Sequence, residues 1–473
     1  MILTTSGAGA APNSLLRERN DVAAAPGVRE KHAEHARKVA RISQQLRNRK
    51  STAPLSIRKK AVSHQVPKAG DLRRSDEKVD VTDLDQILEI DPVRRTCTAE
   101  PGVTFVDLVT ATMKHGLVPI IVPEFKTITI GGAVSGCSIE SMSYKYGGFH
   151  DTCLEYEVIT ATGEVLTCTP DNENSLVFQM IHGSFGTLGI VSKLKFRLVP
   201  SKPYVKMKYE KYGTLEEYQA AIWRVYQNRD WDFMDGIIHS PTEYVLSLGN
   251  FVDEAPYTNS YDWLKVYYQS TSKRKEDFLK TPDYFFRYDR GVTNVHPKSF
   301  LGRLFFGKFM GSTEVLKLAE KFNWLLPKEK PTIILDVFIP FSKVPAFMEW
   351  YGREFKHFPL WCVPYKRVRN YEWISDRFFQ TMTDEKDELF VDLAIYGMKQ
   401  TGDVNYHKLM EDKLLELGGI KTLISHNYYS EEDFWKTWNK PNYDAVKARV
   451  DPHNIFRDLY TKMCKAAMGV SAG

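Results

Sequence analysis

Glycine and serine dominate the segment Thr127-Ile-Thr-Ile-Gly-Gly-Ala-Val-Ser-Gly-Cys-Ser-Ile-Glu-Ser-Met-Ser-Tyr-Lys-Tyr-Gly-Gly-Phe-His-Asp151, the densest chemical signal of the chain. Gly131, Gly132 and Gly136 follow the run Thr127–Ile130, which predicts a strand. Glycines in such a place let the backbone approach a ligand closely and adopt φ values that other residues avoid. Taken alone, however, a loop of this composition is more often a structural turn than a ligand cradle.

The spacing of these glycines is not that of a Rossmann dinucleotide site. The pattern GGxxxG differs from G-x-G-x-x-G, and no suitable acidic residue closes a βαβ unit after it. Neighbouring serines still offer hydroxyls and backbone amides suited to a phosphate or to the edge of an isoalloxazine ring; these are Ser135, Ser138, Ser141 and Ser143.

Length and composition indicate a folded protein of two to three domains. The chain has 473 residues, of which 43% are hydrophobic, 26% charged and 12% aromatic. The net charge is +5, but residues 17–60 hold 13 basic and four acidic side chains, so the rest of the chain is slightly acidic. The basicity belongs to an N-terminal arm, and we do not expect nucleic acid as a partner.

The arm is predicted to contain a basic amphipathic helix. Val39, Ile42 and Leu46 are at helical spacing within residues 29–50, and basic residues surround them. One reading is a solvated helix that packs a thin apolar stripe on the body, and the other is a membrane-surface or partner-binding helix. The apolar run Leu117–Pro123 is too short to span a bilayer, and we expect no cleaved secretion signal.

The six cysteines show no metal-like spacing, so we expect reduced thiols in a cytoplasmic protein. From Gly116 to Pro200, apolar runs alternate with glycine-rich turns, which predicts an α+β layout. Residues 201–440 contain long amphipathic segments between strand-like runs and form a second body.

Several motifs, in this order, resemble the FAD-binding domain of the vanillyl-alcohol oxidase and p-cresol methylhydroxylase (PCMH) superfamily: Glu100–Leu108, Leu117–Glu124, the glycine-rich segment ending at Asp151, Val158–Leu166 and Phe185–Val191. A closer resemblance, from about residue 55 to Ala467, is to the Δ24-sterol reductase (diminuto/seladin) family, including bacterial relatives that reduce methylene-fatty acyl lipids. It is carried by Gly136–Gly147, Pro200–Met207, Leu393–Gly397, Glu431–Trp435 and Met463–Ala467.

The resemblance implies a two-part FAD-binding PCMH-type domain with a larger α+β substrate domain. We expect a basic arm in residues 1–50, the FAD-binding domain in 51–200, the substrate (cap) domain in 201–440 and a C-terminal segment in 441–473 that returns to the FAD domain. Noncovalent FAD is expected, with NADPH as reductant. The cofactor-binding candidates are Gly131, Gly132, Gly136, Cys137, Ser138, Glu140, Ser141, Tyr144, Gly147, Gly189 and Arg58.

Two departures from the superfamily pattern stand out. The place of its early glycine-rich pyrophosphate loop is taken by Ser56–Val66, which has no glycine. Arg58, Lys59 and Lys60 are positioned to meet a pyrophosphate there, although a basic run is usually a solvated face. His64 has no motif for covalent flavin attachment and is expected to be a surface histidine. We also expect no N-terminal membrane anchor of the kind that eukaryotic sterol reductases of this family carry, and the basic helix is a candidate for a looser membrane contact.

The activity that the resemblance implies is reduction of an isolated carbon–carbon double bond in a lipid. Such an alkene accepts hydride poorly, so the site needs a positioned acid and a dry aromatic channel. The candidates for the acid are Asp392, Tyr396, His426 and Tyr428. Asp392 lies in an apolar run, where desolvation raises a carboxyl pKa, but a purely structural hydrogen-bonding role is equally open.

Two other functions remain open at this point. The same fold hosts FAD-dependent alcohol or lactone oxidases and dehydrogenases, because fold does not fix function. A noncatalytic protein that uses the basic arm on lipid or nucleic acid is a third reading. Neither the alkene, a sterol Δ24 bond or a methylene-fatty acyl chain, nor the oligomeric state follows from the sequence.

Overall fold

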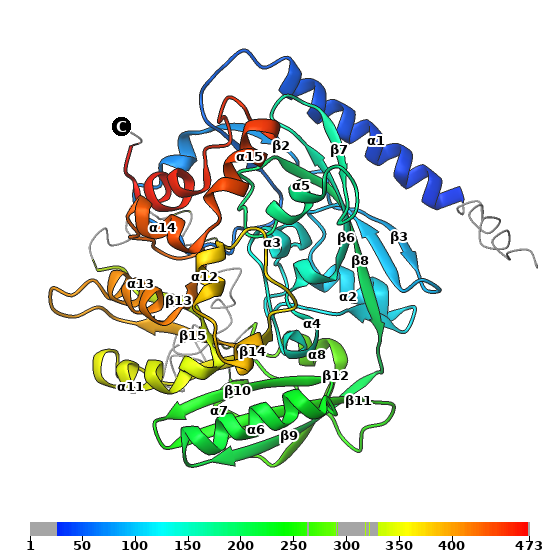
Figure 1. Ribbon diagram of the computed structural model, residues 1–473. Coiled ribbons are helices and arrows are strands. Elements are labelled where there is room, and N and C mark those ends of the chain that lie inside the picture. Colours follow the sequence, from blue (N-terminus) through cyan, green and yellow to red (C-terminus); the bar gives the residue numbers. More distant parts are fainter. Residues whose placement is uncertain are drawn as a thin grey trace, which may run out of the picture.

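Two antiparallel sheets, each with its own helices, build the two parts of the chain (Figure 1). The computed structural model describes residues 26–262, 264–289 and 330–471, together with positions 291, 317 and 321. Within these residues the first sheet has the strand order β3-β4-β8-β6-β7, with β5 paired to β8, and the second has the order β12-β9-β11-β10-β14-β15-β13-β16. Strands β1 and β2 form a separate parallel pair.

The first part lies between residues 55 and 200. Its strands are β1 (Leu55–Arg58), β2 (Glu77–Asp80), β3 (Ile87–Asp91), β4 (Thr96–Ala99), β5 (Leu117–Pro119), β6 (Cys153–Ile159), β7 (Val165–Cys168) and β8 (Ile190–Pro200). Its helices are η1 (Leu72–Ser75), α2 (Phe105–Met113), α3 (Ile130–Ser135), α4 (Ser143–Tyr146), η2 (Phe149–Thr152) and α5 (Ser175–Met180).

The second part begins with β9 and ends after β16. Its strands are β9 (Tyr204–Tyr212), β10 (Phe233–Ser240), β11 (Glu243–Val252), β12 (Glu276–Lys280), β13 (Ile333–Pro340), β14 (Leu360–Lys366), β15 (Leu389–Met398) and β16 (Ile420–Lys421). Its helices are α6 (Leu215–Asn228), α7 (Tyr267–Thr271), α8 (Thr281–Phe285), η5 (Phe341–Lys343), α11 (Val344–Glu354), α12 (Asp376–Gln380), η6 (Glu385–Glu388) and α13 (Tyr406–Leu417).

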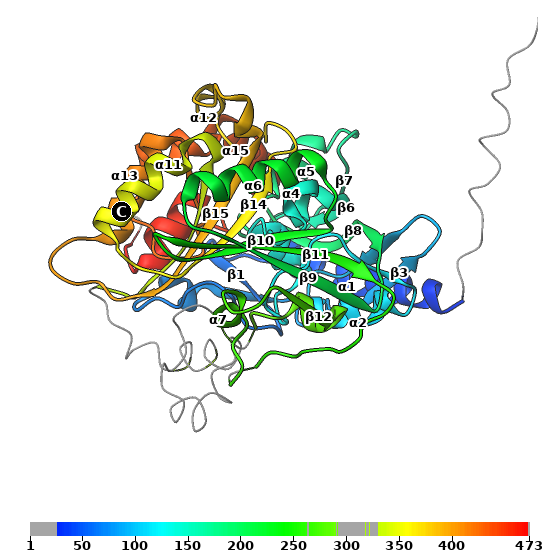
Figure 2. The ribbon, with the colours of Figure 1, turned by 90° about the horizontal axis from the view of Figure 1, so that it is seen from below.

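Both faces of the second sheet are covered, and alternate residues of β15 enter two different cores. Leu393 and Ile395 pack with the residues of α6, α11 and α13, which lie together on the outer face (Figure 2). Ala394 and Tyr396 belong to the core shared with the first part. Because successive strand residues point to opposite faces, the inner face of this sheet is the one that meets the first part.

The strand predicted at Thr127–Ile130 is wrong, because the chain turns there and enters α3. Ile128 N–H donates to Phe125 O at 3.1 Å, which closes a turn. Thr129 then caps α3, with its Oγ1 accepting from Gly132 N–H at 3.2 Å. Two of the three glycines therefore lie within the short helix, and Gly136 ends it.

The predicted amphipathic helix exists as α1 (Pro26–Arg47) and packs along the first part (Figure 1). The expected stripe of Val39, Ile42 and Leu46 is buried. Charged groups reinforce this contact, since His35 bonds Glu100 at 2.9 Å and Glu157 at 2.8 Å. The apolar stripe of the helix therefore packs on the body of the protein, as the first reading expects, while the opposite face stays exposed. No helix among the described residues is long and apolar enough to cross a membrane.

The last segment returns to the first part. It contains α14 (Glu431–Thr437), α15 (Lys440–Val450), a π-helical turn (η7, Thr461–Lys465) and η8 (Ala466–Met468). Ala161 N–H donates to Val450 O at 2.8 Å, and Leu55 N–H to Ile455 O at 2.7 Å. Buried Lys447 also donates to Thr187 O at 2.8 Å, so this segment fixes the loop before β8.

Candidate active site

A group of acids lies on the inner face of the second sheet. Asp336 of β13 pairs in register with Ala394 of β15, so Asp336 and Asp392 are diagonal neighbours on one face. Tyr396, on the same face of β15, donates to Asp336 Oδ1 at 2.6 Å. We call Asp336, Asp392, Tyr396 and Glu124, the last from the loop after β5, the acid cluster.

The acid cluster favours protonated carboxyl groups. Burial raises the pKa of Asp392 well above its usual range, and the neighbouring charges of Asp336 and Glu124 raise it further. Burial also raises the pKa of Asp336 to about 6 and that of Glu124 to about 8. Like charges in a low-dielectric site cannot all ionise together, so the cluster retains protons at neutral pH.

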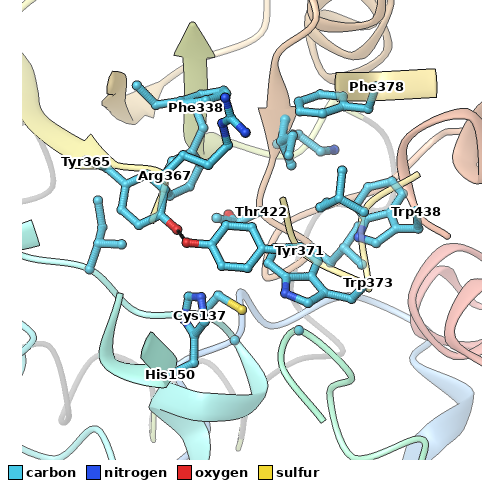
Figure 3. Close-up of a pocket in the computed structure, with 18 of the residues that line it drawn as sticks. Cys137, His150, Phe338, Tyr365, Arg367, Tyr371, Trp373, Phe378, Thr422 and Trp438 are labelled. Carbon is cyan, nitrogen blue, oxygen red and sulfur yellow. Dashed lines mark hydrogen bonds between the residues drawn. The ribbon is translucent and has the colours of Figure 1, made fainter. Parts of the chain in front are cut away.

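An aromatic pocket adjoins this cluster at the boundary between the two parts (Figure 3). Tyr365 and Tyr371 share a hydrogen bond across it, and Tyr371 donates to Asp151 Oδ2 at 3.0 Å. The lining residues come from both parts of the chain: Gly136, Cys137, Ile139, His150, Gly183, Phe185, Phe338, Tyr365, Arg367, Tyr371, Trp373, Ile374, Phe378, Phe379, Phe390, Ile420, Lys421, Thr422, Leu423 and Trp438.

Strand register connects the pocket to the acids. Phe338, which lines the pocket, pairs with Asp392, and Phe390 lies two residues before Asp392 on the same face. Asp392 is not itself among the residues that line the pocket; it is the next residue on this face of β15 after Phe390, which does line it. The acid cluster therefore lies on the same face of the sheet as the pocket and next to its lining.

The four predicted acid candidates fall into two groups. Asp392 and Tyr396 share the acid cluster, whereas His426 and Tyr428 lie in the loop after β16 beside the buried ion pair of Glu411 and Lys421. Burial lowers the pKa of His426 to about 3, so this imidazole is neutral and has no imidazolium proton to give at neutral pH. Burial raises the pKa of Tyr428.

Among the cofactor-binding candidates, Gly136 and Cys137 line the pocket. Cys137 has φ 54°, a left-handed conformation that turns the chain sharply after α3. Ser138 holds this turn, since its N–H donates to Ala133 O at 2.9 Å. Gly132 is exposed, and an added Cβ would meet only Thr129 Oγ1, at 3.2 Å.

Three other glycines are required by packing within the protein. A Cβ on Gly131 would lie 2.6 Å from Pro101 Cβ, and one on Gly189 would lie 2.9 Å from Ile159 O. Gly147 has φ 80° and would bring a Cβ against the Asp151 carboxylate. At these three positions any side chain would clash with a neighbouring segment of the chain. Glycine is therefore required there by packing within the protein, without reference to a ligand.

The polar candidates after Cys137 bond to the second part. Glu140 forms an ion pair with buried Arg287, whose guanidinium also reaches Asp235 at 3.0 Å. Ser141 Oγ lies 2.9 Å from Tyr284 Oη, and Tyr144 donates to Trp231 O. These contacts join the glycine-rich segment to the second part.

The basic run of the early loop lies at the surface. Arg58 pairs with Asp80, and Lys60 pairs with Asp85 at 2.8 Å. His64, expected to be a surface histidine without a covalent flavin link, is half-buried. Its ring stacks on Phe125 and its Nε2 contacts Thr127 Oγ1 at 3.0 Å, and burial lowers its pKa to about 4.

Comparison with known proteins defines the class. Residues 33–169 match the family model described as FAD binding domain. The mixed α+β fold, with this domain followed by a large antiparallel sheet, is as expected. The chain is an FAD-dependent oxidoreductase with a PCMH-type FAD-binding domain.

More particularly, it is a distant homologue of Δ(24)-sterol reductases. It is 26% identical to the human Δ(24)-sterol reductase over 404 residues, covering 81% of this chain and 77% of the human protein. The pea Δ(24)-sterol reductase is 26% identical over 431 residues, covering 82% and 76%. Cytokinin dehydrogenase 5 of Arabidopsis thaliana is 22% identical over 389 residues, covering 75% and 68%.

Two lysines fit the anionic part of FAD: Lys68, which is buried, and Lys462, which is half-buried. Lys462 donates to Phe185 O at 2.9 Å and Lys68 to Val66 O at 3.2 Å; neither has an ion pair with a carboxylate among the described residues. Burial lowers the pKa of each to about 7. A buried ammonium is costly without a counter-charge, and a pyrophosphate would supply one. These lysines would thus hold the cofactor in a chain whose early loop lacks glycine.

Sequence reasoning missed four of these residues, namely Asp336, Glu124, Lys68 and Lys462. Asp336 carried the same signal as Asp392, a single carboxylate within an apolar strand. Glu124 is the last residue of the motif Leu117–Glu124, which supports the family resemblance as a whole and does not mark this carboxylate by itself. The two lysines had no local signal, because their burial comes from contacts between distant segments.

Proposed function

We propose that this protein reduces an isolated carbon–carbon double bond in a lipid, with electrons delivered from NADPH through FAD. The observation that carries the proposal is the acid cluster on the same sheet face as the aromatic pocket, where Asp392 pairs with the lining residue Phe338. The distant similarity to Δ(24)-sterol reductases supports it. A sterol Δ24 side chain and a methylene-fatty acyl chain both present an alkene that would give a tertiary cation, so both are candidate substrates.

Asp392 is the proposed proton donor. An unconjugated alkene accepts hydride poorly, so protonation of one carbon must lead or accompany attack on the other. The Asp392 carboxyl gives its proton to form one C–H bond, and Tyr365 and Tyr371 present ring faces to the resulting positive charge. FAD, when bound and reduced, supplies the hydride for the second C–H bond. Asp392 is then left as a carboxylate and regains a proton from solvent through the cluster.

The main rival is oxidation of an alcohol or lactone by the same class of fold. Such an oxidation needs a base to accept the substrate proton. Burial keeps the carboxyls of Asp392 and Glu124 in the acid form, which favours proton donation over proton removal. The cluster thus supports the reductase.

The experiment separates the two half-reactions of the Asp392→Asn variant under anaerobic conditions. Bleaching of bound flavin by NADPH should match the wild type. Reoxidation by an alkene lipid, tested with a Δ24 sterol and a methylene-fatty acyl phospholipid, should slow by about 10²- to 10⁴-fold, the usual contribution of a general acid. Asp253→Asn, an exposed carboxylate paired with Lys202, is the control. Unchanged reoxidation in Asp392→Asn, or failure of both lipids to reoxidise the wild type, would count against the proposal.

We also propose that α1 contacts a membrane surface. The basic side chains of Arg29, Arg37 and Arg47 are exposed on this helix, away from the buried stripe. Replacing all three with Gln should reduce binding to anionic vesicles and remove its salt dependence. Binding that is equal for the variant and insensitive to salt would refute this contact.

A further inference from the structure

One cation at the edge of the aromatic pocket has no counter-charge. Arg367 follows β14, and among the described residues it has no ion pair; its NH1 group donates to Asn370 Oδ1, and its guanidinium lies over Phe379 at 5.3 Å. Its Nε is buried without a hydrogen-bond partner in the described structure. The other cation of the lining, Lys421, is already paired with Glu411.

The described pocket lining also lacks a carboxylate that could accept hydrogen bonds from its unpaired donors. No aspartate or glutamate is among the described residues that line it. Trp373 Nε1, a second lining atom that lacks a partner in the described part of the chain, can only donate. Thr422 Oγ1 and the two ring nitrogens of His150 also lack hydrogen-bond partners there, but a hydroxyl can donate or accept and a neutral imidazole offers one donor and one acceptor. Within the described lining, Arg367 and Trp373 are thus the unpartnered groups that can only donate, in a wall that is otherwise apolar and aromatic (Figure 3).

Register places Arg367 and Asp392 at opposite ends of the same surface. Val363 of β14 pairs with Asp392, Tyr365 pairs with Phe390, and Arg367 N–H continues the ladder by donating to Glu388 O at 2.8 Å. Arg367 is thus four residues beyond Val363, or about 13 Å of strand from the Asp392 position. The aromatic side chains of Tyr365 and Phe390 lie between them.

We propose that the aromatic pocket binds an apolar chain that ends in an anionic group, with the anionic oxygens at Arg367 and the chain directed along the sheet towards Asp392. A carboxylate and a phosphate share this chemistry, because guanidinium binds the oxygens of both. The placement of the alkene at Asp392 rests on the proposed function, whereas the binding preference does not. A neutral sterol has no group that Arg367 requires.

The test measures equilibrium binding to the FAD-loaded protein, independently of turnover. The probes are oleate, oleoyl lysophosphatidic acid and oleyl alcohol, which share one chain and differ in the head group, with cholesterol as the neutral sterol. Charge-assisted hydrogen bonds should make at least one anionic probe bind about tenfold or more tightly than oleyl alcohol. The two anionic probes show whether a carboxylate or a phosphate is preferred.

The preference must depend on Arg367. In Arg367→Met the anionic probe and the alcohol should bind equally, while Arg367→Lys should keep part of the difference. Arg353→Met, an exposed arginine on α11 that pairs with Glu349, should behave as the wild type. Flavin content and melting temperature show that each variant is folded.

Three outcomes would overturn the proposal. They are equal binding of anion and alcohol by the wild type, a preference retained in Arg367→Met, and cholesterol binding more tightly than either anionic probe. Failure of the proposed reduction has a different signature. In that case the anionic probes bind with the expected preference, but no alkene lipid reoxidises the flavin.

Discussion

Tyr396 on β15 donates a hydrogen bond to Asp336 on β13 across 2.6 Å, and this bond links the two strands that hold the buried acids. Burial raises the pKa of Asp336, while the Tyr396 hydroxyl opposes the rise by stabilising the carboxylate. Asp392 senses that charge, since a carboxylate at Asp336 raises its pKa. The protonation of the proposed acid is therefore set partly by a neighbouring tyrosine.

Tyr396→Phe should shift the pH profile of alkene-dependent reoxidation. Without the hydroxyl the pKa of Asp336 rises, so Asp336 carries less negative charge and raises the pKa of Asp392 less. The falling limb of the profile, where the Asp392 acid is lost, should therefore move to lower pH. Tyr351→Phe, which removes a hydroxyl bonded to His357 O in the outer core, provides the matched control. A limb that stays in place or moves to higher pH would show that Tyr396 does not act on the acid through Asp336.

Glu124→Gln should change how stability depends on pH. The pKa of Glu124 is raised to about 8 from the ordinary 4.5, so folding favours the protonated form. Its contribution is full below pH 4.5 and is lost as pH rises through 8, because the unfolded state releases the proton first. Wild-type melting temperature should therefore fall relative to the variant between about pH 4.5 and 8. Parallel melting curves for both proteins across this range would contradict the raised pKa.

His35 should make the docking of α1 dependent on pH. Burial opposes its charge, but hydrogen bonds to Glu100 and Glu157 outweigh burial and raise its pKa above 6.5. Lys38, also bonded to Glu100, and Lys193, bonded to Glu157, face the same carboxylates.

Because the pKa of His35 is raised, its contribution is full below pH 6.5 and is lost as pH rises through the raised value. His35→Ala should cost about 1 to 3 kcal/mol at low pH, the usual range for hydrogen bonds to charged groups, and less at high pH. Urea unfolding at several pH values measures this. His115→Ala, which changes an exposed histidine, is the control. A loss of unfolding free energy in His35→Ala that grows with pH would contradict the raised pKa of His35.

Lys462→Met should lower the amount of flavin that stays with the protein. The variant loses the half-buried ammonium that fits the cofactor's anionic part and also its hydrogen bond to Phe185 O. Flavin absorbance per chain after gel filtration gives the result, and the melting temperature of the flavin-free protein separates a folding defect. Lys440→Met removes an exposed lysine paired with Asp444. Equal flavin content in both variants would exclude Lys462 from the cofactor site.

Local pattern was sufficient for many elements of the fold. The amphipathic segments expected within residues 201–440 include α6 and α13, and the apolar runs expected between Gly116 and Pro200 include β7 and β8. The strand expected at Thr127–Ile130 failed because the Thr129 hydroxyl caps a helix, an interaction that hydrophobic pattern does not encode. Helical and strand periodicity arise because one face of the element is buried. A long element repeats this pattern several times, so it is easier to predict from sequence than a short one.

The sequence by itself determined the class: ordered motifs pointed to an FAD-binding domain, and an aspartate in an apolar run marked Asp392. Only the tertiary structure decided which groups meet. Asp336 and Glu124 join Asp392 because sheet register and the packing of the two parts bring residues more than 200 positions apart together. It also separated His426 from them, and it placed Arg367 along the same face as Asp392. Proton affinity depends on burial and neighbouring charge, and both arise only when the chain is folded.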